Sequence, residues 1–121
     1  RFYAVLRGQK CNGHWSESLD GKEWTVAKDI GFPLHCPQLH RIGHTILLAH
    51  RLPNTALHWS VDECRTWRGP IKVDSVGGAY PGMVTLRDGS VLIVYYEEGP
   101  TSRIRARRFS VSKEDIKFQG F

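Results

Sequence analysis

The sequence repeats at an interval of about 44 residues. Residues 37–42 (PQLHRI) resemble residues 81–86 (PGMVTL), 44 positions later. In both copies a turn follows, and then a continuous apolar run, at 46–51 and at 91–96. A fixed period of about 20 to 50 residues is typical of proteins that stack one supersecondary unit. The repetition therefore constrains the fold more than any single element does.

Each unit reads as a set of β-strands. Asp88-Gly89 lies between two apolar runs, which is the strongest short-range signal for a tight β-hairpin turn. The run 91–96 is apolar at almost every position, so we expect an interior strand that is covered on both faces. The glycine and proline residues around Tyr80 predict a sharp turn just before the unit's first strand. Third strands are predicted at 13–18, 56–60 and 103–111, and outer strands at 25–30 and 71–76.

Four short strands per repeat of about 40 to 45 residues are typical of a β-propeller blade. We therefore predict an all-β chain that forms a partial β-propeller of about two and a half to three four-stranded antiparallel blades. The predicted parts of this one domain are a blade fragment (1–33), a complete blade (34–76) and a further blade (77–121). Known propellers close into rings of about four to eight blades. We expect either that the remaining blades belong to the same polypeptide or that copies of the chain self-associate.

The composition is that of an ordinary globular chain. Hydrophobic residues make up 40% and charged residues 24%, and no apolar run approaches the roughly 18 residues that span a bilayer. The formal charge of +5 favours anionic partners, but the arginines of 103–108 lie within a predicted strand and have no aromatic residues interleaved with them. We therefore predict neither a nucleic-acid partner nor a membrane partner. The chain starts inside a predicted strand, so the sequence leaves its cellular location open.

Cysteine and histidine residues show no spacing that suggests a metal site. The three cysteines are odd in number and include no C-x-x-C pair, so we expect reduced thiols. The six histidines are spread over predicted loops and strands, whereas a zinc site needs three or four convergent ligands. We predict no metal and no cofactor.

One turn carries a recognisable motif. The segment SVDECRTW, from Ser60 to Trp67, resembles the Asp box S-x-D-x-G-x-T-W of sialidase-type propeller blades, with Cys64 in place of the glycine. Asp62 can accept hydrogen bonds from backbone amides across the turn, while the indole of Trp67 packs beneath the hairpin. We expect a structural role for this motif. A shorter copy contains Asp20 and Trp24.

Together with the repeat, these motifs resemble those of the exo-α-sialidase-like (BNR/Asp-box) propellers, a six-bladed family. The resemblance covers residues 3–109, which look like the C-terminal half of such a domain. Its most specific matches are GAYP at 78–81, LRDG at 86–89 and YYE at 95–97.

The resemblance implies a sialidase-like glycoside hydrolase that acts on acidic, sialoside-type glycans. Tyr80 would be the catalytic nucleophile. Arg7 and Arg51 would bind the substrate carboxylate, Tyr96 would line the pocket, and Glu97 would steady an arginine of this clamp. A sialoside carries a carboxylate on its anomeric carbon, which repels an anionic nucleophile, and sialidases use tyrosine instead. Arginines can clamp such a carboxylate through paired, charge-assisted hydrogen bonds.

The sequence also departs from the family pattern. Pro81 follows the tyrosine where serine is usual, and Asn54 and Thr55 stand where a third clamp arginine is expected. The activating glutamate, the first arginine and the aspartate acid/base would belong to blades before Arg1, so the chain by itself is expected to be inactive. A second interpretation therefore stays open, in which the chain belongs to a non-catalytic propeller module that binds a glycan or a protein.

Overall fold

The structure is a computed structural model that describes residues 1–51, 54–112 and 115–120. These residues form β-strands and no helix, so the predicted all-β class is confirmed. The ten strands are β1 (Phe2–Leu6), β2 (His14–Ser18), β3 (Lys28–Asp29), β4 (His35–Ile42), β5 (Thr45–Arg51), β6 (Asn54–Ser60), β7 (Arg68–Thr85), β8 (Val91–Glu97), β9 (Arg103–Val111) and β10 (Ile116–Phe118).

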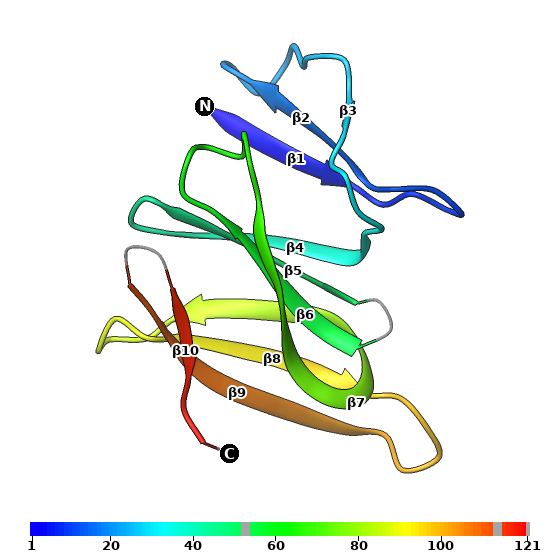
Figure 1. Ribbon diagram of the computed structural model, residues 1–121, viewed down its shortest axis with the longest axis vertical. Coiled ribbons are helices and arrows are strands. Elements are labelled where there is room, and N and C mark those ends of the chain that lie inside the picture. The colour runs from blue at the N-terminus through cyan, green and yellow to red at the C-terminus, as the bar shows by residue number, and fades with distance from the viewer. Residues whose placement is uncertain (52–53, 113–114, 121) are drawn as a thin grey trace.

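The strands form two antiparallel sheets (Figure 1). The smaller sheet has the order β1-β2-β3, and the larger has the order β10-β9-β8-β7-β6-β5-β4. The 18-residue strand β7 divides the larger sheet, because its first part pairs with β6 and its second part pairs with β8. The larger sheet thus consists of two four-stranded halves, β4 to β7 and β7 to β10, that share β7. Neither sheet is closed in the described structure.

Two predictions about β7 and β3 need correction. The glycine pair Gly77-Gly78 was expected to turn the chain, yet β7 continues through it and only changes its pairing partner there. The outer strand predicted at 25–30 is reduced to the two residues of β3. Beside it, the Thr25 hydroxyl accepts the Glu17 amide at 3.1 Å, so a side chain takes a place in the pairing that a strand would have filled.

Two apolar clusters hold the sheets together. β5 contributes to both because its side chains alternate between its two faces. One cluster packs between the two halves of the larger sheet and comprises Leu47, Ala49, Leu57, Val73, Val91, Ile93, Tyr95, Phe109 and Ile116. The other packs against the smaller sheet and comprises Trp15, Ile30, Leu34, Ile46, Leu48 and Cys64.

The strand that is covered on both faces is therefore β5 and not β8. In β8, Val91, Ile93 and Tyr95 are buried, whereas the alternate residues Leu92 and Val94 are only partly buried. The prediction for 91–96 was wrong because the apolar sequence fits two covered faces, while the described chain covers only one.

The inner strands β4 and β7 share one irregularity. Each has a bulge that starts with a residue in left-handed conformation, Cys36 (φ 52°) in β4 and Tyr80 (φ 48°) in β7. A proline follows in both cases, Pro37 and Pro81, and proline has no amide to donate to a neighbouring strand. The two bulges lie 44 residues apart, so the repeat extends to backbone detail. Pro81, which departs from the family motif, fits this bulge.

Candidate functional site

The candidate site lies at the edge of the sheets where β5 and β8 end and where β4 begins. Tyr80 lies near the start of the part of β7 that pairs with β8. The bulge takes Tyr80 out of the regular pairing, since Ala79 pairs with Tyr96 and the next pair is Gly82 with Val94. Tyr80 is 66% exposed, and its hydroxyl has no hydrogen bond to the described residues. A left-handed conformation costs a residue with a side chain about 1 to 2 kcal/mol, and such strain often occurs at functional sites.

Arg7 and Arg51 come together around the start of β4. Arg7 follows the end of β1, and its guanidinium lies 3.4 Å from Nδ1 of His35 and 3.9 Å from Sγ of Cys36. His35 is in turn the strand partner of Arg51 at the end of β5. The structure thus brings the two predicted arginines to neighbouring positions, with His35 between them. Sequence reasoning had assigned no role to His35.

Arg51 is oriented by a carboxylate from the other half of the larger sheet. Its Nη1 lies 2.9 Å from Oε1 of Glu98, which immediately follows β8. The predicted partner Glu97 pairs instead with Arg103 at 3.2 Å and with Arg105 at 3.4 Å. Tyr96 is half-buried beside it. The residue that steadies a candidate clamp arginine is therefore Glu98 in this structure.

A buried polar network lies behind this edge. The Tyr95 hydroxyl donates to Oδ2 of Asp74 at 2.5 Å, and Nε of Arg105 donates to the same oxygen at 2.8 Å. Burial acts to raise the pKa of Asp74, but the hydrogen bonds from Tyr95 and Arg105 outweigh it and leave the pKa below its usual value. Burial, together with the bond to Asp74, raises the pKa of Tyr95 to about 12. Because Arg105 also contacts Glu97, the network joins the core to the site edge.

The longer Asp box is built on one carboxylate. Asp62 accepts the Thr66 hydroxyl at 2.5 Å, the Thr66 amide at 2.9 Å and the Ser60 hydroxyl at 2.8 Å, and these bonds lower its pKa to about 2. The Ser60 oxygen accepts the Cys64 amide at 2.9 Å. Cys64 has a φ of 66°, the left-handed conformation that favours the glycine of the family motif. Trp67 packs against the cluster beside the smaller sheet.

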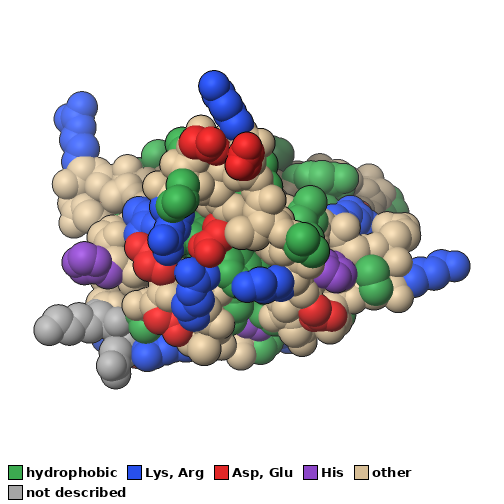
Figure 2. Space-filling model, turned by 90° about the horizontal axis from the view of Figure 1, so that it is seen from above, with side chains coloured by type: hydrophobic (Ala, Val, Ile, Leu, Met, Phe, Trp, Pro, Cys, Tyr) green, Lys and Arg blue, Asp and Glu red, His purple; other side chains and the backbone are tan. Residues whose placement is uncertain are grey.

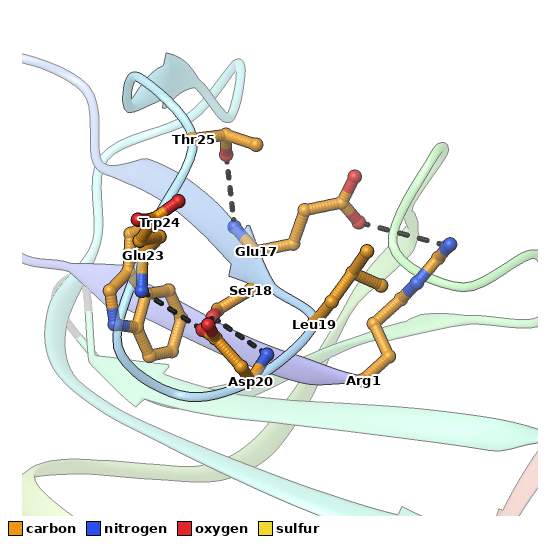
Figure 3. A pocket seen from close by; sticks show the side chains of 8 residues that line it. All are labelled: Arg1, Glu17, Ser18, Leu19, Asp20, Glu23, Trp24 and Thr25. Carbon is orange, nitrogen blue, oxygen red and sulfur yellow. Dashed lines mark hydrogen bonds and ion pairs between the residues drawn. The ribbon is translucent and has the colours of Figure 1, made fainter.

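The shorter Asp box lines a pocket of about 440 Å³ (Figure 3). Asp20 accepts the amides of Lys22 at 2.8 Å and Glu23 at 2.9 Å, so its carboxylate is occupied by the turn. Trp24 is 44% exposed there, unlike the packed Trp67 of the longer box. The Asp20 carboxylate in this pocket therefore holds the turn together and is not available to a ligand.

The surface charges are mixed. Figure 2 shows basic and acidic side chains interspersed on the face in view. Ion pairs explain part of this pattern, as Arg65 lies 3.2 Å from Glu17 and Arg41 lies 2.8 Å from Glu63. In the described ranges, no group of three or more histidine, cysteine or acidic residues could hold a metal ion.

No protein-family model matches the chain, and neither a curated protein nor a solved structure matches it. The described residues contain no helix that is long and apolar enough to cross a membrane. The class that the structure defines is an all-β protein of antiparallel sheets.

Proposed function

We propose that the chain is part of a β-propeller whose edge, at Tyr80, binds an acidic sugar, within a sialidase-like glycoside hydrolase. In this proposal residues 34–76 and 77–121 are successive blades, and residues 1–33 belong to the blade before them. The shared strand β7 supports this interpretation, because its second part would be the inner strand of the next blade. The inner strands also contact each other, as His40 Nε2 lies 2.8 Å from the Thr85 hydroxyl.

One observation carries the proposal: Arg7 and Arg51, which occupy equivalent places in the repeat, lie at the same edge of the sheets as Tyr80. Both arginines lie at or just after the end of a strand that leads to the same edge, and Tyr80 projects from a bulge there. The Arg7 contact with His35, the strand partner of Arg51, supports a combined role in binding an anion. Two guanidinium groups can bind one carboxylate through charge-assisted hydrogen bonds.

The chemistry follows from the substrate's own charge. The Tyr80 oxygen would attack the anomeric carbon while the glycosidic oxygen leaves, and the neutral phenol avoids repulsion by the substrate carboxylate. A phenol has an ordinary pKa near 10, so the attack needs a base that accepts its proton. The described residues place no carboxylate in hydrogen-bond contact with Tyr80. We therefore assign the base and the acid to other parts of the full-length protein.

Kinetics of the full-length protein with a fluorogenic α-sialoside test the proposal. We expect Tyr80→Phe to lower kcat at least about 100-fold, because the nucleophilic oxygen is removed. Arg51→Lys should raise KM about tenfold, because paired hydrogen bonds to the carboxylate are lost. Tyr3→Phe is the matched control, since the Tyr3 hydroxyl contacts Glu63 of the longer Asp box. Unchanged turnover in Tyr80→Phe would rule out the nucleophile assignment.

A second candidate function is binding of an acidic glycan without hydrolysis. Two observations favour it. The Tyr80 hydroxyl has no carboxylate partner in the described chain, and the Asn54 amide, at the place of a third arginine, is bonded to the carbonyls of Ser75 and Val76 at 3.0 and 3.1 Å. Retention on a sialylated glycan array together with an absence of released aglycone would support this function. Release of the aglycone would exclude it.

A further inference from the structure

A separate pocket lies between the loop after β3 and strands β5 to β7. Its volume is about 550 Å³, within the range of about 300 to 1,000 Å³ typical of small-molecule sites. Four of its lining residues are apolar or aromatic and four are polar. They are Phe32, Pro33, Ala56 and Pro70, and His50, Asn54, His58 and Lys72.

Three stacked or bonded rings form one wall of this pocket. Phe32 lies parallel to His58, with ring centroids 3.8 Å apart and an angle of 4° between the planes. His58 Nδ1 lies 2.8 Å from His50 Nε2. Burial lowers the pKa of each histidine to about 4, so both rings are neutral at pH 7. This aromatic part of the lining is therefore uncharged, and Phe32 covers the face of His58.

One polar atom of this wall is left without a partner. His50 is only 4% exposed, and its Nδ1 is buried with no hydrogen bond among the described residues. An unsatisfied buried polar group carries a desolvation cost, and such groups are few in native proteins. This nitrogen is therefore an enclosed polar group behind the pocket lining that the described residues leave unsatisfied.

Positive charge lies at the open side of the pocket. Lys72 is exposed on β7, and none of the ion pairs among the described residues involves its ammonium group. Asn54 lies on β6 nearby, where its two bonds to carbonyl oxygens hold its amide in place. A ligand that enters here would meet an ammonium group outside and neutral rings inside.

We propose that this pocket binds a small molecule with a flat aromatic body and a carboxylate. The aromatic body would pack against Phe32, which covers the neutral ring of His58, so no charged group lies beneath it. The carboxylate would lie toward Lys72, where it stays partly hydrated and gains an opposite charge. The pocket shares Asn54 with the edge where Arg51 ends β5, but its lining includes neither Tyr80 nor the two arginines of the proposed clamp.

Titration of the full-length protein with 1-naphthoate tests this site, with 1-naphthalenemethanol as the uncharged analogue. Binding is followed by calorimetry and by the imidazole resonances of His50 and His58 in NMR spectra. We expect saturable binding of naphthoate that shifts both imidazoles. The alcohol should bind about fivefold more weakly, because it lacks the charge that faces Lys72.

Variants of Lys72 separate the charge from the shape of the pocket. Lys72→Met should weaken the binding of naphthoate about fivefold and leave the binding of the alcohol unchanged. Lys72→Arg, which keeps the positive charge, should bind naphthoate with the wild-type affinity. Lys117→Met, on β10 outside this pocket, is the matched control. The proposal is overturned if naphthoate shows no saturable binding up to about 10 mM. It is also overturned if Lys72→Met weakens the binding of both probes equally, or if naphthoate shifts only the imidazole resonances of the exposed His44.

Discussion

The buried pair His50 and His58 predicts that the protein loses stability as the pH falls below 6.5. In the unfolded chain both rings have the ordinary pKa of 6.5, whereas in the folded protein burial lowers both values to about 4. The unfolded state therefore binds more protons between these two values. The contribution of the neutral pair is complete above pH 6.5 and is lost as the pH falls toward 4.

The size of the effect follows from the two pKa values. A difference of about 2.5 units for each ring, at about 1.4 kcal/mol per unit, sets an upper limit of about 3.5 kcal/mol per histidine. Between these pKa values, each histidine changes the free energy of unfolding by up to about 1.4 kcal/mol per pH unit. Both side chains are almost fully buried, with exposures of 4% and 6%.

Urea unfolding followed by tryptophan fluorescence measures this slope. Measurements from about pH 5 to 7 avoid most of the titration of aspartate and glutamate in the unfolded chain. His58→Gln should flatten the dependence on pH, because it removes one depressed pKa and the hydrogen-bond partner of His50. His44→Gln, at an exposed turn, is the control and should keep the wild-type slope. Equal slopes in wild type and His58→Gln would refute the reasoning.

Three further substitutions test other parts of the structure, each by urea unfolding. Ser60→Ala should lower the free energy of unfolding by about 1 to 2 kcal/mol, because the buried amide of Cys64 loses its acceptor. The control Ser110→Ala should lower it by less than about 0.5 kcal/mol. Equal losses in the two variants would contradict the structural role of the longer Asp box. Asp74→Asn should lower the free energy of unfolding by about 2 to 3 kcal/mol, because a buried carboxylate that pairs with Arg105 and accepts the Tyr95 hydroxyl loses its charge. An unchanged free energy of unfolding would show the network to be dispensable. Tyr80→Gly should raise stability by up to about 1 kcal/mol, since relief of the left-handed strain exceeds the entropy that glycine adds to the unfolded chain. A loss of stability would instead indicate that the tyrosine packs.

Much of the strand pattern was predictable because it depends on local sequence. The turn at Asp88-Gly89 and the apolar runs beside it place β8 correctly at its first residue. The continuity of β7 was not predictable, because Gly77-Gly78 is as compatible with a turn as with a strand that changes partners. The choice between them depends on β6 and β8, which lie on either side of β7.

The site was predictable only in outline. The repeat was enough to place Arg7 and Arg51 at one edge, because the two arginines stand 44 residues apart at the ends of equivalent strands. The side chains that contact these arginines could not be predicted, since His35 is 28 residues from Arg7 and Glu98 is 47 residues from Arg51. No local pattern specifies contacts over such separations. The unpartnered nitrogen of His50 likewise follows only from the packing around it.

The shared strand β7 has a consequence for how the protein unfolds. If either four-stranded half came apart alone, about half of the 18 residues of β7 would lose their neighbour while the other half stayed paired. The exposed amides and carbonyls of that segment would adjoin a cluster to which both halves contribute side chains. We therefore expect both halves to melt in one cooperative transition, with the slowest hydrogen exchange in the central strands around β7.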